Sequence, residues 1–506
     1  MSLQKNEELV KKNEELVKKN DQILNIISDN IISDNIYKRK SFNYNDFEIE
    51  GANNDQLKAF NELKNIFIDF KENGNAPKHI YSILGAAGSG KSWLISKMVE
   101  FLSKMGLKTR LTTPTHKTIS VLKNMVSNIE LGYGPVNTGT IYNFLNLKID
   151  YGIDDNIEND DHQLNGVARL VVNTFNMCLD DTDVLFIDES SMIDNSLYNY
   201  IENIIGDRAQ IIIFVGDYFQ LTSPGGEMSP IYCNNTNIKT IQLTETVRQK
   251  AESVIINKSN WLKHYISTQQ FPSNIMDLFM EDESEIKIFD TTKDQNEHNK
   301  FLETYFNDES NRIIGSYTNK MVDEYNTYVR NILKDNPKDK IIIGDILITQ
   351  SPYSRVNGIQ TFNNGEEFEV IDISIKEDGY KGLNIYNGKY KKCLDNTEVG
   401  KFVALHESSL DAYNDLLENS KLQATLENDR FKKKKYWREY FKLLNKFVQY
   451  KYIYASTIHK LQGSTYENTY FDSRDLLWFY KKNPDLVCRL VYVIITRPTK
   501  NLYILK

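Results

Sequence analysis

The residues best suited to do chemistry form an eight-residue loop, Gly85-Ala86-Ala87-Gly88-Ser89-Gly90-Lys91-Ser92. An apolar run at residues 80–84 precedes the loop and an amphipathic stretch at residues 93–102 follows it, which predicts a strand, a loop and a helix. In this context the glycines let backbone N–H groups surround phosphate, Lys91 reaches the β- and γ-phosphate oxygens, and the Ser92 hydroxyl can ligate Mg²⁺. We therefore predict that the chain binds ATP with Mg²⁺.

A pair of carboxylates, Asp188 and Glu189, follows the apolar run 184–187, which is typical of a strand buried on both faces. Open parallel sheets bind ligands at the carboxyl ends of their strands, so we expect this pair near the phosphate loop. Asp188 would hold Mg²⁺, directly or through water, and Glu189 would orient or deprotonate the attacking water. Taken alone, the pair is also compatible with a strand followed by solvated acids. With the phosphate loop it predicts nucleotide hydrolysis.

The composition restricts the class of protein. A chain of 506 residues has room for roughly three or four domains. Because 61 basic residues face 69 acidic ones and the net charge is −8, any contact with nucleic acid must be local, in a lined groove. The four cysteines are far apart, which argues against a zinc site or a secreted disulfide framework. The sequence shows no apolar run as long as a membrane span and no signal-peptide core, so we expect a cytoplasmic protein without a membrane partner, in the host cytosol if a phage encodes it.

The order of apolar runs predicts an α/β fold. Strand-like runs at residues 80–84, 107–112, 184–187 and 211–215 fit a parallel sheet with crossover helices. A second α/β pattern starts after Arg248, with a strand at residues 313–317. It resumes near Tyr452 and ends in the apolar runs 490–495 and 502–505. Between its halves, the turn-rich residues 341–387 suggest a small β barrel, and residues 407–450 are helical by composition.

The first forty residues are repetitive. The segment 5–11 recurs unchanged at 12–18, with Leu9, Leu16 and Ile23 one heptad apart. This period predicts a helix with a narrow apolar stripe, either a weak coiled coil or a duplicated appendage without a role in catalysis. We expect that deleting residues 1–40 leaves ATPase activity intact.

Further polar segments follow the expected strands and helices in a fixed order. They are Asn54-Asp55-Gln56-Leu57, Thr112-Thr113-Pro114-Thr115-His116-Lys117, Thr138-Gly139-Thr140-Ile141-Tyr142, Gly216-Asp217-Tyr218-Phe219-Gln220-Leu221, Leu243-Thr244-Glu245-Thr246-Val247-Arg248, Thr318-Asn319-Lys320, Tyr454-Ala455-Ser456-Thr457-Ile458-His459-Lys460-Leu461-Gln462-Gly463-Ser464-Thr465 and Tyr492-Val493-Ile494-Ile495-Thr496-Arg497. With the loop and the carboxylate pair, this ordered set resembles the superfamily 1 DNA helicases, in their RecD-like and Dda-like branch. The resemblance covers about residues 45–506.

The resemblance implies an α/β fold class: two RecA-like parallel-sheet lobes of the P-loop NTPase type, with an inserted SH3-like β barrel and a helical tower. The implied domains are a repeat-bearing appendage (1–40), the first lobe (41–245) with a pin insertion (about 143–172), the first part of the second lobe (246–340), the barrel (341–406), the tower (407–450) and the second part of the second lobe (451–506). The second lobe is thus interrupted by an insertion.

Several nucleotide contacts are implied by the resemblance. Gln56 would read the adenine edge, since an amide donates and accepts at once, although a solvated glutamine at a helix start has the same pattern. Gln220 would sense the γ-phosphate. Arg248 and Arg497 would approach it from the cleft as arginine fingers, where a lone arginine would otherwise suggest a surface ion pair. Gln462, together with the adjacent Gly463, would lie toward the nucleotide.

DNA contacts are implied in the same way. The hydroxyls, imidazoles and amides of these segments suit the phosphates and sugars of a single strand, and the residues favoured are Thr113, Pro114, His116, Thr140, Thr318, Asn319, Thr457 and His459. A helix N-cap competes for Thr140, and a polar strand end for residues 318–320. The segment 454–465 would touch both ligands, which is what coupling between them requires.

The strand-separating parts of the family are less evident here. The expected pin region contains the acidic stretch 154–161, which would repel phosphate, and lacks the phenylalanine expected to stack on the junction base pair, so Tyr151 or Leu164 would have to replace it. Tyr436-Trp437 would dock the tower onto the pin, or Trp437 would be a core residue.

The function predicted by the resemblance is an ATP-driven motor that moves 5′ to 3′ on single-stranded DNA, one nucleotide per ATP, and unwinds duplex or displaces bound protein. Its partners would be single-stranded DNA, junctions with duplex DNA, and single-strand-binding or other replication proteins, and it would work as a monomer. One alternative is a nucleotide-switched DNA-binding protein without directional movement. A phosphotransferase is a weaker alternative, because it has no use for a segment joining nucleotide to polymer.

Overall fold

The computed structural model describes residues 43–74, 80–150, 169–172, 182–205, 211–223, 228–233, 237–245, 253–354, 360–393 and 399–506. The chain divides into two units, residues 1–50 and 51–506. The described part of the first unit contains a short 3₁₀ helix, η1 (Tyr44–Asp46). The repeats of residues 1–40, the acidic stretch 154–161 and Arg248 lie outside the described residues. The second unit holds the elements considered below.

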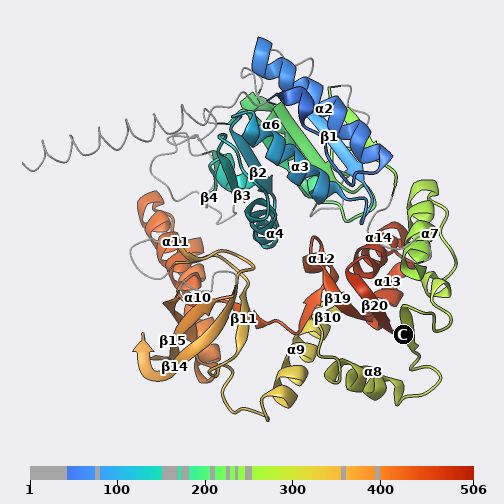
Figure 1. Ribbon diagram of the computed structural model, residues 1–506. Coiled ribbons are helices and arrows are strands. Elements are labelled where there is room, and N and C mark those ends of the chain that lie inside the picture. Colours follow the sequence, from blue (N-terminus) through green and yellow to red (C-terminus); the bar gives the residue numbers. More distant parts are fainter. Residues whose placement is uncertain are drawn as a thin grey trace, which may run out of the picture. The chain divides into compact units, whose positions relative to one another are not determined.

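The first half of the second unit is built on a six-stranded sheet in which every pairing is parallel (Figure 1). Across the sheet the strands are β3 (Val136–Thr140), β2 (Thr109–Thr113), β6 (Val184–Ile187), β7 (Ile211–Gly216), β1 (Ile80–Gly85) and β8 (Lys239–Leu243). The helices are α2 (Asn54–Asn73), α3 (Lys91–Lys104), α4 (His116–Ser127), α5 (Ile141–Phe144) and α6 (Asn195–Ile205). Residues of β6 and β7 are buried throughout, as expected of central parallel strands covered on both faces.

The expected pin region begins and ends on a strand pair. β4 (Leu147–Asp150) and β5 (Arg169–Val172) pair antiparallel, and the residues that connect them, 151–168, lie outside the described residues. The two strands therefore form the base of an insertion between β3 and β6.

A second parallel sheet follows, with five strands (Figure 1). Across the sheet they are β18 (Ala455–Thr457), β10 (Arg312–Ser316), β19 (Tyr466–Asp472), β20 (Pro498–Leu505) and β9 (Ile286–Phe289). The helices are α7 (Val254–Thr268), α8 (Glu297–Phe306), α9 (Asn319–Leu333), α12 (Ile458–Leu461), α13 (Arg474–Tyr480) and α14 (Pro484–Ile495), with the 3₁₀ helix η4 (Ile275–Leu278). The two parallel sheets confirm the predicted α/β fold class.

Helix α14 contains the apolar run 490–495, and only the later run, 502–505, belongs to a strand, β20. Every residue from Val487 to Ile495 is buried, Arg489 among them, so the helix is covered on all sides there and the run 490–495 has no polar face that would mark it as helical. Its start is marked by Asn483, whose side chain accepts a hydrogen bond from Leu486 N–H, and by Pro484 in the first turn.

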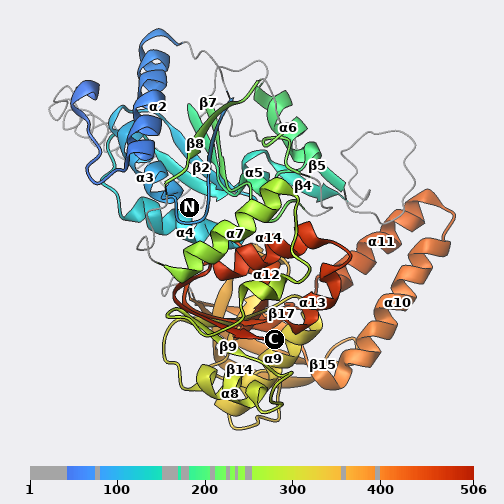
Figure 2. The same cartoon turned by 90° about the vertical axis from the view of Figure 1, so that its right-hand side faces the viewer.

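Between β10 and β18 the chain forms a five-stranded antiparallel sheet and a helical hairpin. Across the sheet the strands are β16 (Val399–Leu405), β15 (Leu383–Lys392), β14 (Glu367–Tyr380), β11 (Ile346–Thr349) and β17 (Tyr450–Tyr452), beside a small pair, β12 (Tyr353–Ser354) and β13 (Gln360–Phe362). After the 3₁₀ helix η5 (Glu407–Ser409), α10 (Leu410–Leu426) and α11 (Arg430–Leu444) lie side by side (Figure 2). Trp437 is buried and stacks on Phe441, as a core tryptophan does. Closure of the sheet into an SH3-like barrel stays a prediction.

A buried ion pair connects α9 to the antiparallel sheet. The Arg330 guanidinium donates to both carboxylate oxygens of Asp345, at 2.8 to 3.2 Å, and lies over the ring of Tyr452. Both partners of the pair are almost fully buried. The insertion is therefore fixed to the second parallel sheet by a charge-assisted contact. Among the described residues, no helix is both long and apolar enough to cross a membrane.

Candidate nucleotide and nucleic-acid sites

The phosphate loop joins β1 to α3, as predicted. Gly88 and Gly90 have φ of 82° and 80°, in the left-handed region that glycine adopts without strain, and Gly90 is the N-cap of α3. The Lys91 ammonium donates to the carbonyls of Gly85 and Ala86, at 2.7 and 3.0 Å. The lysine thus lies across the loop, where phosphate oxygens would replace the two carbonyls.

The loop opens into a cleft of about 590 Å³. The predicted nucleotide residues that line this cleft are Gln56, Ala87, Gly88, Gly90, Lys91, Ser92, Asp188, Glu189, Gln220, Gly463 and Arg497. They come from the start of α2, from the carboxyl edge of the first sheet, and from the segments that follow α12 and α14. Arg248 lies outside the described residues. The structure therefore brings most of the predicted nucleotide residues to one place.

Asp188 and Glu189 follow β6 at this edge. Burial, together with the neighbouring Glu189 carboxylate, raises the pKa of Asp188 to about 7, although the Glu189 N–H and the charge of Lys91 act in the opposite direction. Two partly buried carboxylates held side by side favour a cation near them. The pair and the Ser92 hydroxyl fit a Mg²⁺ site, because the ion would restore the ionised form of Asp188.

Glu189 is held by the segment that follows α12. Its side chain accepts a hydrogen bond from Gln462 Nε2 at 3.0 Å, and the same nitrogen donates to Ser191 Oγ at 3.1 Å. Gly463 comes next, with φ of 74°, and a Cβ there would lie 2.4 Å from Thr118 Cγ2 and 3.1 Å from Glu189 Oε1. Only glycine permits this close approach, which explains on steric grounds why a glycine follows Gln462.

Gln220 and Arg497 occupy fixed positions. Gln220 Nε2 donates to Asp217 Oδ2 at 3.3 Å, while its buried Oε1 has no partner among the described residues. Arg497 follows α14 and donates to the carbonyls of Val493 and Ser464, at 2.8 and 3.0 Å. Both side chains are therefore held in place by contacts within the fold.

Gln56 has a structural role in addition to its place in the cleft. Its Oε1 accepts from Asn53 N–H while Asn53 accepts from Gln56 N–H, which is a capping box at the start of α2. Its Nε2 donates to the Ser89 carbonyl at 3.2 Å. Adenine recognition by Gln56 stays a prediction.

A second cavity, of about 480 Å³, lies beside the cleft. Five of the predicted DNA residues line it: Pro114, His116, Asn319, Thr457 and His459. Burial lowers the pKa of both histidines, and for His116 the charge of Glu366 acts in the opposite direction. Both imidazoles are therefore less readily protonated than a free histidine, and they would meet a polymer as hydrogen-bonding groups.

Three predicted DNA residues use their hydroxyls within the fold. Thr140 caps α5 through Asn143 N–H, and Thr318 caps α9 and donates to Asp475 at 2.8 Å. The buried Thr113 hydroxyl bonds to that of Thr118. None of the three is among the residues that line the cavity. Their DNA contacts stay predictions, and for Thr140 the N-cap alternative describes what the hydroxyl does here.

Two protein-family profiles match the chain: an AAA domain over residues 74–269 and a UvrD-like helicase C-terminal domain over residues 452–505. The ATP-dependent DNA helicase dda of Enterobacteria phage T4 is 23% identical over 452 residues, which cover 83% of this chain and 93% of that protein. The chain is a superfamily 1 helicase of the Dda type.

Two further similarities accompany this assignment. An uncharacterized protein, R530, of Acanthamoeba polyphaga mimivirus is 24% identical to the helicase over 460 residues, 78% of this chain and 90% of that protein. A crystal structure of the Pif1 helicase from Candida albicans covers 91% of this chain and 95% of its own, with 14% identity and a TM-score of 0.45.

The sequence patterns missed one side of the second cavity of the helicase. Gln350, Asn364 and Lys451, all from the antiparallel sheet and its turns, line that cavity together with Lys460. Lys460 bonds to Gln350, and Lys451 donates to Asn319 Oδ1 at 3.2 Å. No local motif marks these residues, because they reach the cavity only through the fold.

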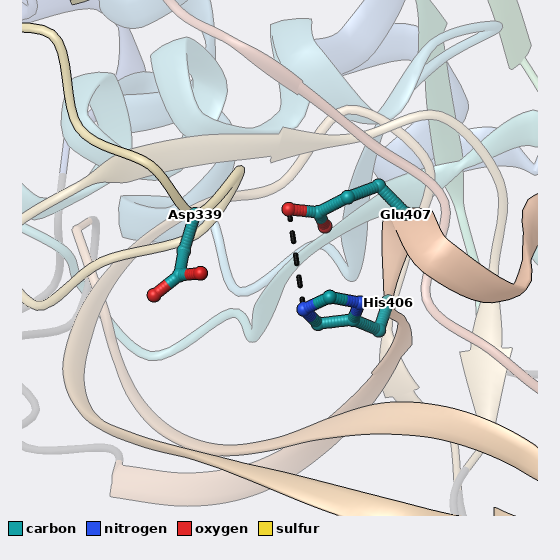
Figure 3. A group of neighbouring side chains, drawn as sticks. All are labelled: Asp339, His406 and Glu407. Atoms are coloured by element: carbon teal, nitrogen blue, oxygen red, sulfur yellow. Dashed lines mark ion pairs between the residues drawn. The ribbon is translucent and has the colours of Figure 1, made fainter.

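A second group of titratable side chains, Asp339, His406 and Glu407, lies away from both cavities in the helicase (Figure 3). His406 Nδ1 accepts from Ser408 N–H at 3.2 Å, so the neutral ring carries its proton on Nε2, the nitrogen nearest Glu407. A metal-ligating histidine donates from its second nitrogen instead. Glu407 also accepts from the Tyr386 hydroxyl at 2.8 Å. The group therefore fits a structural contact better than a metal site.

Proposed function

We propose that the chain is an ATP-dependent DNA helicase that moves 5′ to 3′ on single-stranded DNA and unwinds duplex or displaces bound protein. One observation carries this proposal: the segment 457–465 lines both cavities. Thr457 and His459 line the second cavity, Gly463 and Thr465 line the nucleotide cleft, and Gln462 between them binds Glu189. An element that touches both ligands can transmit a change at one to the other.

In the nucleotide cleft we assign the roles by chemistry. Lys91 and the loop N–H groups from Gly85 to Ser92 hold the phosphates, with Ser92 and Asp188 as Mg²⁺ ligands. Glu189 orients or deprotonates water, and Gln220 senses the γ-phosphate. Arg248 and Arg497 stabilise the charge of the transferring phosphoryl group.

In the second cavity a single strand of DNA would be gripped alternately by the two lobes. Pro114 and His116 belong to the first lobe, and Asn319, Thr457 and His459 to the second. The antiparallel sheet, which we assign to the inserted barrel, adds Lys451 and Gln350. Junctions with duplex DNA and single-strand-binding proteins are the further partners we propose, for a motor that works as a monomer.

Forked duplexes with a tail on either the 5′ or the 3′ strand test this proposal. We expect unwinding only with the 5′ tail, ATP turnover that single-stranded DNA accelerates strongly, and ejection of streptavidin from one end of an oligonucleotide. The Lys91→Ala variant is the matched control, because it should lose turnover and keep the fold.

Two results would contradict the proposal in different ways. ATP turnover that is the same with and without single-stranded DNA would exclude a motor. Stimulated turnover without any directional displacement would instead favour a nucleotide-switched DNA-binding protein.

A further inference from the structure

The Tyr492 hydroxyl joins the two parallel-sheet lobes at the back of the phosphate loop. It donates to Asp217 Oδ2 at 2.9 Å and accepts from the backbone N–H of Ala87 at 3.0 Å. The donor roles are fixed, because a carboxylate oxygen can only accept and a backbone N–H can only donate. Tyr492 is 1% exposed, so neither bond is exchanged with solvent.

The three residues of this contact, Ala87, Asp217 and Tyr492, belong to different parts of the nucleotide site. Ala87 is in the phosphate loop and lines the cleft. Asp217 precedes Gln220 and accepts from its amide with the same Oδ2 that Tyr492 uses. Tyr492 itself lies on α14, and Arg489, three residues earlier on the same helix, donates to the carbonyls of Tyr218 and Gln220. One hydroxyl therefore connects the loop, the glutamine segment and α14, the helix that precedes Arg497.

The bond to Ala87 competes with phosphate. A phosphate loop works by offering backbone N–H groups to the anion, and each N–H makes one good hydrogen bond. In the structure the second lobe supplies the acceptor for Ala87 N–H. A phosphate oxygen that takes this N–H must displace the tyrosine hydroxyl, which then keeps only Asp217.

We propose that Tyr492 is a positioning residue that reports occupation of the phosphate loop to the second lobe, by exchanging its acceptor role at Ala87 for a phosphate oxygen. The proposal rests on the proposed ATPase function of the cleft. In this role Tyr492 acts on the affinity for nucleotide and on nucleotide release, whereas other groups contact the reacting phosphate. Burial and the Asp217 carboxylate raise the pKa of Tyr492 well above its ordinary value, so the hydroxyl stays neutral.

The Tyr492→Phe variant of the full chain tests this role. It removes the competing acceptor and leaves Ala87 N–H unpaired in the empty state only, so we expect ADP and ATP to bind about fivefold more tightly, the equivalent of one net hydrogen bond. ADP release should slow by a similar factor, and the stimulation of turnover by single-stranded DNA should fall. Binding is measured with a fluorescent ADP analogue, which needs no hydrolysis.

Tyr480→Phe is the matched control. Tyr480 is a buried tyrosine of the same lobe, and its hydroxyl donates to the Pro272 carbonyl at 2.7 Å, away from the cleft. Both variants should melt at a lower temperature, but only Tyr492→Phe should bind nucleotide more tightly. Unchanged or weaker nucleotide binding by Tyr492→Phe would overturn the role of Tyr492. Absence of ATP turnover in the wild-type chain would instead overturn the proposed function.

Discussion

Replacement of Arg497 by alanine separates two things that this side chain does. As an arginine finger it would stabilise the transferring phosphoryl group by a factor of about 10³ in rate, or about 4 kcal/mol. As a structural group it donates to the carbonyls of Val493 and Ser464 in a buried setting. Loss of these two bonds should lower the free energy of unfolding by roughly 1–3 kcal/mol, which a folded domain tolerates. The variant should therefore fold, bind ATP almost normally and turn it over about 10³-fold more slowly.

The assay compares DNA-stimulated turnover, ATP affinity and thermal melting of Arg497→Ala with those of Arg497→Lys. Lysine keeps the charge but lacks the planar fork that spans two carbonyls, so it should restore part of the rate and little of the stability. A turnover within tenfold of wild type would refute the finger. So would a loss confined to ATP affinity, since a finger acts on the transition state more than on binding.

Two further predictions follow from the structure. Burial lowers the pKa of His116 and His459 below the ordinary value of 6.5, so both side chains are neutral at pH 7. Acidification from about pH 7 to 5.5 should add positive charge to the second cavity and tighten the binding of a labelled single-stranded oligonucleotide. The double variant with His116→Gln and His459→Gln should not show this effect. The unfolded chain binds more protons than the folded chain in this pH window, so stability should fall at the same time. Replacement of Arg330 by methionine leaves the buried Asp345 without its partner and should lower the free energy of unfolding in urea by about 3–5 kcal/mol, whereas a change below about 1 kcal/mol would show that the pair is unimportant.

The parts of the site that were predicted correctly depend on local signals. The phosphate loop lies between a short apolar run and an amphipathic stretch, and the structure has β1 and α3 there. Asp188 follows the apolar run 184–187, whose short length favours a central strand over a helix. In both places the same few residues specify the element and carry the chemistry. The sequence therefore locates the nucleotide cleft before any tertiary contact is known.

Other features of the molecule could be recognised only from the three-dimensional fold. The run 490–495 is rich in Ile and Val and has no alternation of polar and apolar residues, so the sequence alone fits a buried helix and a buried strand equally well. Only Asn483 and Pro484, which mark the start of α14, favour the helix. Thr140 and Thr318 follow strands and precede helices, where a hydroxyl serves equally as an N-cap or as a ligand for DNA. Gln350 and Lys451 reach the second cavity from a sheet that is inserted between two halves of a lobe, and no spacing in the sequence indicates it.

The coupling of the two cavities is located more narrowly than the motifs suggest. Thr118 and Glu189 line both the nucleotide cleft and the second cavity, so the cavities share a wall. Gln462 binds Glu189 across that wall, and Gly463 is packed so closely against Thr118 that no side chain fits between them. A closely packed contact changes in discrete steps and not by gradual bending. Under the proposed function, a strand of DNA that displaced His459 would shift Gln462, three residues along the same segment, relative to Glu189. The effect of DNA would then reach the group proposed to activate water.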